Sequence, residues 1–189
     1  MNRGADVAVR PYSKGDLPLL ERTLGDPRMM KHLGGPESVE KLWERHKKFV
    51  AMSEDSSKGC IFVISVGSEK ALAGTVGYWE KDWDGGKVWE TGWSVLPEFQ
   101  GEGIATAATK LVVERVTKLR GHKYLMAFPS VDNHPSNAIC RKLSFVLLGE
   151  SQYEYPRGSG SFMRCNNWRL DLFRSTNKEQ RQGEPNIPL

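Results

Sequence analysis

A glycine-bearing segment between a strand pattern and a helix pattern constrains this chain most. Residues 88–95 alternate as a strand does, a turn follows at residues 96–99, and Gly101 and Gly103 precede a helical pattern that begins at Ile104. Glycine leaves main-chain N–H groups unobstructed, and the first turn of a helix adds unpaired donors at the positive end of its dipole. The segment therefore predicts a site for a phosphate or pyrophosphate, and hence for a nucleotide-like cofactor.

Spacing separates this segment from two other kinds of phosphate loop. A P-loop ends in Gly-Lys-Ser/Thr, and residues 104–106 contain no lysine. A dinucleotide-binding turn has its glycines directly after the strand, a third Gly or Ala, and an acidic residue roughly twenty positions on. Here residues 96–99 intervene, Thr106 stands at the third position, and residues 120–123 are basic. Both readings fail.

The pattern Gln100-x-x-Gly103-x-Ala105 resembles the acyl-CoA pyrophosphate loop of the GNAT N-acetyltransferases. As in that family, a strand of the form Glu-x-Gly-Trp-x-Val (residues 90–95) precedes the loop and a long helix follows it. Residues 133–145 resemble the family's Asn-x-x-Ser-Asn…Lys-Leu-Gly-Phe segment, in the form seen in the RimJ/RimL-like branch. The likeness covers roughly residues 7 to 172 in element order.

Two residues depart from the family pattern. Ser144 stands where the family usually has glycine, and Cys140 stands where many members carry a tyrosine that protonates the departing thiolate. The first departure concerns a tight turn, and the second leaves the general acid of this chain open.

The order of sequence patterns predicts one α+β domain over residues 1–174, followed by a polar, disordered tail at residues 175–189. Strands are expected at residues 7–10, 61–66, 72–79, 88–95, 124–128, 145–153 and 162–173, and helices at 13–24, 36–52, 104–119 and 135–143. The strand–helix–strand unit from 88 to 128 requires a right-handed crossover, which makes its two strands parallel neighbours. The resemblance implies the GNAT fold, a mixed and mostly antiparallel sheet of about seven strands flanked by about four helices.

Acetyl-CoA is the cofactor that the resemblance implies, with pantetheine between the two parallel strands and pyrophosphate on the following helix. The main-chain N–H near Val95 is where the family polarises the thioester oxygen. The residues expected to contact the cofactor are Ser94, Val95, Leu96, Gln100, Gly101, Glu102, Gly103, Ile104, Ala105, Thr106, Asn133 and Asn137. For Asn133, an ordinary role as helix N-cap is the alternative.

Direct attack of an amine on a thioester, in a ternary complex, requires a base for the amine and a proton donor for the sulfur. Glu90 is the candidate base, because strand alternation places it on the same face as Ser94; a purely structural carboxylate is the alternative. Ser136 and Cys140 are four residues apart on the predicted helix and are the candidate donors, Ser136 being favoured by the branch resemblance. A buried core thiol is the alternative for Cys140.

The acceptor is expected to be a primary amine, on a protein N-terminus or a small molecule. Trp79, Trp83 and Trp93 are candidates for an aromatic acceptor slot, with Glu80, Asp82 and Asp84 as a negative rim that would attract a cation. Core tryptophans and a solvated hairpin tip explain the same residues equally well. A CoA-binding sensor or interaction module without turnover, and transfer of another acyl group such as succinyl, stay open as alternatives.

Composition excludes other classes of function. The net charge of +4 comes from basic residues spread among acidic ones, so nucleic acid is not expected as a partner. The three cysteines are widely spaced, which predicts neither disulfides nor a metal site. The chain shows no signal peptide and no apolar run of the ~20 residues that cross a bilayer, so a cytoplasmic location without a membrane partner is expected. The family often pairs its subunits, so the resemblance allows a homodimer.

Overall fold

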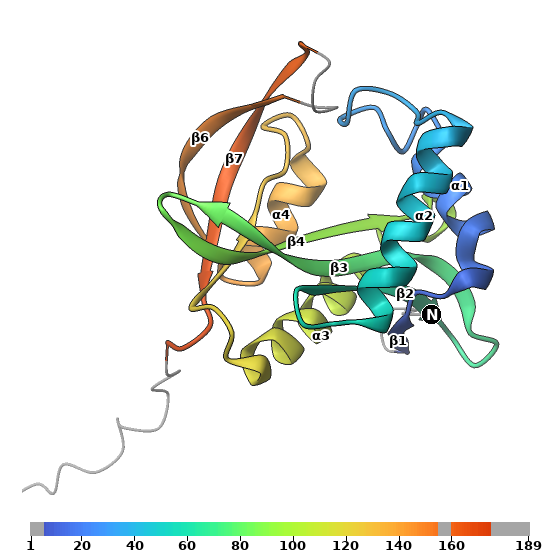
Figure 1. Ribbon diagram of the computed structural model, residues 1–189, viewed down its shortest axis with the longest axis horizontal. Coiled ribbons are helices and arrows are strands. Elements are labelled where there is room, and N and C mark those ends of the chain that lie inside the picture. The colour runs from blue at the N-terminus through green and yellow to red at the C-terminus, as the bar shows by residue number, and fades with distance from the viewer. Residues whose placement is uncertain (1–5, 155–159, 175–189) are drawn as a thin grey trace, which may run out of the picture.

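The computed structural model describes residues 6–154 and 160–174 of the 189-residue chain (Figure 1). The tail predicted at residues 175–189 lies outside the described residues. Within them, helices and strands follow one another in the expected order.

A single seven-stranded sheet organises the described chain, with strand order β1-β2-β3-β4-β5-β7-β6. Its strands are β1 (Val7–Pro11), β2 (Gly59–Val66), β3 (Ala71–Trp83), β4 (Gly86–Val95), β5 (Tyr124–Ala127), β6 (Val146–Glu154) and β7 (Phe162–Asp171). The helices are α1 (Leu17–Leu24), α2 (Val39–Glu54), α3 (Ile104–Leu119) and α4 (His134–Lys142), with short 3-10 turns η2 (Lys14–Asp16) and η3 (Pro97–Phe99). Among the strands of the described residues only the β4–β5 pair is parallel, which confirms the mixed sheet and the crossover through α3.

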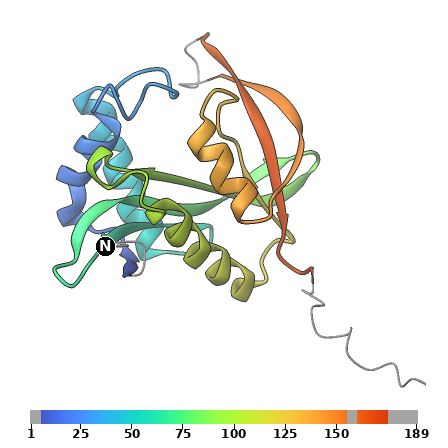
Figure 2. The same ribbon diagram turned by 180° about the vertical axis from the view of Figure 1, so that it is seen from behind.

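The helices cover both faces of the sheet, as Figures 1 and 2 show from opposite sides. On one face α1 and α2 bury a cluster that includes Leu20, Leu42 and Val63. On the other face α3 buries its apolar stripe against the sheet, in a larger cluster that includes Val112 and Trp89. The central strands of the sheet are therefore buried on two sides, whereas β6 is largely exposed.

The β3–β4 hairpin is longer than the sequence pattern predicts. Its turn consists of Asp84 and Gly85, with φ of 48° and 75°, which is the left-handed backbone of a two-residue hairpin turn. The strands expected at residues 72–79 and 88–95 leave out the charged residues 80–82, which nevertheless pair across the ladder. As a result Lys81 and Trp83 belong to the sheet.

The two parallel strands separate after a very short ladder. They pair only at Trp89 with Leu125 and at Glu90 with Met126, and β5 ends at Ala127 while β4 continues to Val95. Residues 91–95 of β4 thus have no partner in β5 along the described chain. An opening between parallel strands, on the side of their carboxyl ends, is where α/β sheets bind ligands.

Candidate active site

Gly101 and Gly103 form an open loop before α3. Both have φ of 79°, and a Cβ placed on either would meet no atom within 4 Å. Within the described residues, the main-chain N–H groups of Gly101, Gly103, Ile104, Ala105 and Thr106 have no backbone acceptor. The loop therefore presents several free donors and open space at the positive end of the α3 dipole, which suits a diphosphate.

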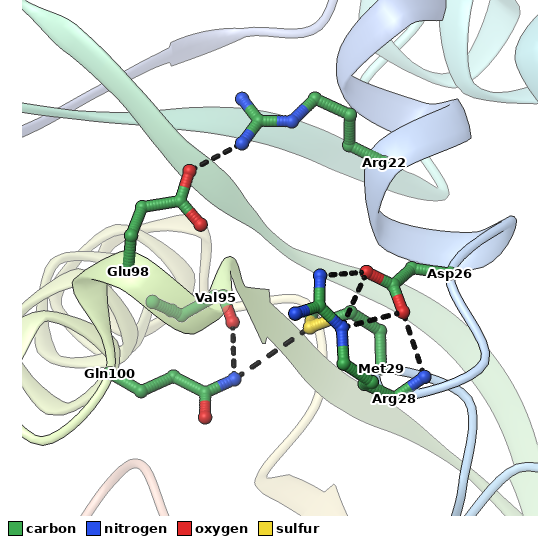
Figure 3. A network of polar contacts seen from close by, with 7 residues as sticks. All are labelled: Arg22, Asp26, Arg28, Met29, Val95, Glu98 and Gln100. Atoms are coloured by element: carbon green, nitrogen blue, oxygen red, sulfur yellow. Dashed lines mark hydrogen bonds and ion pairs between the residues drawn. The ribbon is translucent and has the colours of Figure 1, made fainter.

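The end of β4 is fixed by the residues that follow it (Figure 3). Gln100 Nε2 donates a hydrogen bond of 2.8 Å to the carbonyl oxygen of Val95 and lies 3.7 Å from Met29 Sδ. Arg22 of α1 forms an ion pair with Glu98 of η3. The loop after β4 is thereby attached to α1 and to the segment that follows it.

These contacts refine the roles of the residues expected to bind the cofactor. The side chain of Gln100 is committed to Val95, and its main-chain N–H donates to Pro97 O at 3.2 Å, so the structure gives Gln100 a positioning role. Leu96 is buried in the core, and its N–H donates to Ala73 O at 2.8 Å in β3. Because successive N–H groups of a strand point to opposite sides, the Val95 N–H faces the opening beside β5.

Other residues of this set lie around the same opening. Ser94 is partly buried and pairs with Thr75 of β3. Glu102, between the two glycines, is partly buried as well. Asn133 is the N-cap of α4, and its Oδ1 accepts a hydrogen bond from the main-chain N–H of Ser136 at 3.1 Å. The capping role considered for Asn133 is therefore seen, while its contact with a cofactor stays a prediction.

Asn137 is a buried junction between α4, β7 and the segment after β5. Its Oδ1 accepts hydrogen bonds from Asn166 Nδ2 (2.7 Å) and Trp168 Nε1 (2.8 Å). Its Nδ2 donates to the carbonyl oxygens of Ser130 (2.9 Å) and Asn133 (2.8 Å). These four bonds use the hydrogen-bonding capacity of the amide, so Asn137 holds the site's framework and offers its side chain to no ligand in this arrangement.

The two candidate proton donors differ in exposure. Ser136 lies in the first turn of α4 and is partly exposed. Cys140 is fully buried, and burial raises the pKa of its thiol to about 12. A thiol of that kind stays protonated near neutral pH and has no exposed surface from which to reach a ligand.

Glu90 forms an ion pair that the sequence reading did not foresee. Lys81 Nζ lies 2.9 Å from Glu90 Oε2, and the two side chains are 26% and 18% exposed. The same ammonium lies 4.5 Å from the ring centroid of Phe128 and 5.1 Å from that of Tyr153. Aromatic faces attract cations at these distances, so Lys81 is held by a carboxylate and two rings together.

Phe128 and Tyr153 form an aromatic cage with Trp83. The ring centroids of Trp83 and Phe128 are 4.9 Å apart, and those of Phe128 and Tyr153 are 5.2 Å apart. The Tyr153 hydroxyl is buried without a hydrogen-bond partner in the described part of the chain. Burial, and then the negative charge of Glu90, raise the pKa of this phenol, so it stays protonated.

The structure places two of the three tryptophans proposed for the acceptor on the sheet face of Glu90. Trp79 lies directly across from Glu90, and its indole covers Gly92, where an added Cβ would lie 2.9 Å from the ring. Trp83 belongs to the aromatic cage. Trp93, by contrast, packs against the core cluster beneath α3, on the opposite face of the sheet from Glu90. The three therefore do not form one slot.

The expected negative rim is partly neutralised by a lysine of the same hairpin. Lys87 Nζ lies 2.7 Å from Glu80 Oε2 and 3.6 Å from Asp82 Oδ1. Glu80 also lies 3.0 Å from His122 Nε2. The charge that faces a ligand near Glu90 is set by Lys81 more than by this rim.

Sequence reasoning missed Lys81, Phe128 and Tyr153. For Lys81 a signal existed, because Trp79, Lys81 and Trp83 occupy alternate positions and share a strand face once β3 is extended to residue 83. Tyr153 comes from β6, far away in sequence, and no local pattern connects it to Glu90.

Comparisons with known proteins agree with this geometry. A family model described as acetyltransferase (GNAT) domain matches residues 6–146. The chain therefore belongs to the GNAT acetyltransferase family. No curated protein matches the sequence.

Solved structures share the fold. The ribosomal-protein-S5-alanine acetyltransferase from Vibrio fischeri has a TM-score of 0.73 at 20% identity, over 89% of this chain and 94% of that one. The spermidine N-acetyltransferase from Vibrio cholerae, in complex with CoA and spermine, has a TM-score of 0.71 at 19% identity, over 89% of this chain and 96% of that one. The acetyltransferase from Salmonella typhimurium that modifies the N-terminal serine of ribosomal protein L7/L12 has a TM-score of 0.71 at 18% identity, over 88% of this chain and 95% of that one.

In residues 6–154 and 160–174, no helix is long and apolar enough to cross a bilayer. The same residues contain no group of three or more His, Cys, Asp or Glu side chains placed to hold a metal ion.

Proposed function

We propose that the protein transfers the acetyl group of acetyl-CoA to a primary amine, by direct attack within a ternary complex. The observation that carries the proposal is the open donor loop at residues 101–106, placed directly after the strand that separates from β5. The free N–H groups and the space above both glycines fit a diphosphate, and the unpaired edge of β4 fits a chain with amide groups such as pantetheine.

In this proposal each part of the site has one task. The donors of residues 101–106 hold the diphosphate, and the edge of β4 at residues 91–95 binds and aligns pantetheine. A main-chain N–H of β4, in the stretch up to Val95 that faces the opening, polarises the acyl oxygen, a role that needs no side chain. Bound acetyl-CoA supplies the activated acetyl thioester.

Proton transfer is assigned to two side chains. Glu90 accepts the proton of the attacking amine, and its position beside the narrow end of the opening supports that role. Ser136, partly exposed at the start of α4, donates a hydrogen bond to the departing sulfur. Cys140 receives no role in proton transfer, because it is buried with a raised pKa.

The acceptor is a primary amine of a protein N-terminus or of a small molecule. Structures with the same fold include enzymes of both kinds, one for ribosomal protein S5 and one for spermidine. Trp79 and the aromatic cage line the face of Glu90, which suits an aliphatic ammonium. A specific observation supports the second candidate, a CoA-binding module without turnover: Lys81 forms an ion pair with Glu90, the candidate base. Transfer of another acyl group, such as succinyl, is compatible with the same loop.

Thiol release from acetyl-CoA, measured with a panel of peptide N-termini and aliphatic amines, tests the proposal. Removing a general base typically costs 10²–10⁴-fold, so Glu90→Gln is expected to lower kcat/KM by about 100-fold or more. Ser136→Ala is expected to cost about tenfold, the effect of one hydrogen bond. Glu150→Gln is the matched control, because Glu150 is an ion-paired glutamate of β6 outside the site, and it should leave the rate unchanged.

The outcome of this assay separates the candidates. Acetyl-CoA binding with equal background hydrolysis in all four proteins, whatever the amine, would support the binding module and refute the enzyme. Turnover with succinyl-CoA but not with acetyl-CoA would assign the other acyl group.

A further inference from the structure

We propose that Lys81 is a self-acetylation site: the protein transfers an acetyl group to its own Lys81, which lies in hydrogen-bond contact with the candidate base Glu90. This inference rests on the proposed function, since it uses the same acyl donor and the same base. It adds a modification site and a way in which that site controls Glu90.

The first support is the distance between the two groups. A general base must lie within about 2.6–3.2 Å of the amine that it deprotonates. Lys81 Nζ and Glu90 Oε2 are 2.9 Å apart, so Lys81 already occupies the position that an acceptor amine must take. Its side chain is 26% exposed, so the ammonium is shielded but still reachable.

The second support is the place of this pair in the sheet. Glu90 and Met126 form the last rung of the β4–β5 ladder, so the opening between the strands begins beside Glu90. The diphosphate loop lies at the other end of the opening, after β4 ends at Val95. A cofactor bound by that loop and extended along β4 therefore directs its acyl end toward Glu90 and Lys81.

The third support is the aromatic cage. Phe128 and Tyr153 place their rings 4.5 Å and 5.1 Å from Lys81 Nζ, and the Trp83 ring lies 4.9 Å from that of Phe128. The lysine side chain is thus confined to one orientation at the narrow end of the opening. Confinement of a nucleophile next to its base raises the effective concentration of the amine.

The transfer balances without any further reactant. Glu90 takes one proton from the Lys81 ammonium, and the lone pair of the freed amine attacks the carbonyl carbon of the acetyl thioester. A nitrogen–carbon bond forms, the carbon–sulfur bond breaks, and the sulfur leaves as the CoA thiolate. Counting all protons, one ammonium and one acetyl-CoA give one acetyl-lysine, one CoA thiol and one proton.

Acetylation changes the electrostatics at Glu90. An acetamide carries no charge, so it forms no ion pair with Glu90 and no cation–π contact with Phe128 or Tyr153. Glu90 is then available to an external amine. Self-acetylation thereby converts a protein whose base is occupied into one whose base is free.

The test incubates the full-length protein with acetyl-CoA and follows lysine acetylation by tryptic peptide mass spectrometry, because acetyl-Lys81 blocks cleavage after residue 81. Lys87 is an internal reference: it lies on the same hairpin, pairs with Glu80 at 2.7 Å, and is 54% exposed. Non-enzymatic acetylation follows exposure and would favour Lys87. Self-acetylation is expected to modify Lys81 at least tenfold faster than Lys87, at a rate that does not depend on protein concentration.

Variants make the result specific. Glu90→Gln is expected to slow acetylation of Lys81 at least tenfold and to leave Lys87 unchanged, and Lys81→Arg removes the modified peptide. Acetylation of Lys81 no faster than that of Lys87, or at a rate proportional to protein concentration, would overturn the inference. If an external amine is acetylated while Lys81 stays unmodified, the inference fails and the proposed function stands. If acetyl-CoA is not bound at all, both fail.

Discussion

Substitution of Gly103 by alanine separates the role of the loop in ligand binding from its role in folding. Gly103 is the N-cap of α3 with φ of 79°, in the left-handed region. There a residue with a Cβ costs about 1–2 kcal/mol. No atom lies within 4 Å of the added Cβ, so no steric clash adds to this value. Alanine also restricts the unfolded chain, which offsets about 0.4–1 kcal/mol. The expected net loss of stability is about 1 kcal/mol.

Gly67→Ala is a matched control for this substitution. Gly67 lies in the turn between β2 and β3, far from the loop, with φ of 72° and no atom within 4 Å of an added Cβ. Both variants should therefore lower the free energy of unfolding by the same ~1 kcal/mol, which corresponds to about 2–4 °C in Tm for a chain of this size. Only at Gly103 does the new methyl group enter the space proposed for the diphosphate.

Calorimetric titration with CoA measures the difference between the two variants. Gly103→Ala should raise Kd at least tenfold, about 1.4 kcal/mol, while Gly67→Ala leaves Kd within about twofold of wild type. Equal Kd values in the two variants, with equal losses of Tm, would refute the assignment of the loop to CoA.

Three further predictions concern the stability of the folded chain. Asn137→Ala leaves Trp168 Nε1 and other buried groups without partners, so it should lower the free energy of unfolding in urea by about 3 kcal/mol. Ser144→Gly relieves a φ of 63° and should raise that free energy by about 0.5–1 kcal/mol. Burial alone would raise the pKa of Asp16, but hydrogen bonds led by those from Arg10 outweigh it and lower the pKa. The stabilisation from Asp16 is thus complete above its unfolded pKa near 4, and it is lost as the pH falls through the lower pKa of the folded state. In unfolding measured as a function of pH, Arg10→Met should make this loss of stability at acid pH smaller.

Each of these predictions has a control on the same chain. Asn133→Ala removes a helix cap and should cost only about 1 kcal/mol, so an equal cost at both asparagines would contradict the junction role. Ser68→Gly lies in a turn without positive φ and should give no gain. Lys14→Met removes one exposed positive charge, and an acid profile identical to that of Arg10→Met would show that net charge alone is responsible.

Local patterns predict the part of the fold that places the cofactor loop. The apolar stripe of α3, the alternation of β4 and the two glycines are properties of contiguous residues, and the crossover rule then fixes the parallel pair. The same reasoning ended β3 too early, because residues 80–83 are mostly charged and do not look like a strand. A hairpin stabilised by its ladder and its two-residue turn accommodates them.

The acceptor side depends on contacts between distant segments. Lys81 comes from β3, Phe128 directly follows β5, and Tyr153 comes from β6, so only the assembled sheet brings them to Glu90. Two of the four hydrogen bonds of Asn137, those from Asn166 and Trp168, likewise join segments that are far apart in sequence. Alternation along β4 does place Trp93 and Glu90 on opposite faces of the sheet, and in the structure Trp93 packs on the face away from Glu90. Sequence patterns define which face a residue is on, whereas its partners across the sheet require the fold.

Titration of ¹⁵N-labelled full-length protein with CoA, followed through its backbone amide resonances, tests the assignment of the donor loop most directly. The account predicts that the largest shifts occur at Gly101, Gly103 and Ile104, with smaller ones along residues 91–95 of β4. Pantetheine, which lacks the diphosphate, should shift the β4 resonances and leave those of the loop in place. Saturable CoA binding without any shift at residues 101–106 would contradict the account.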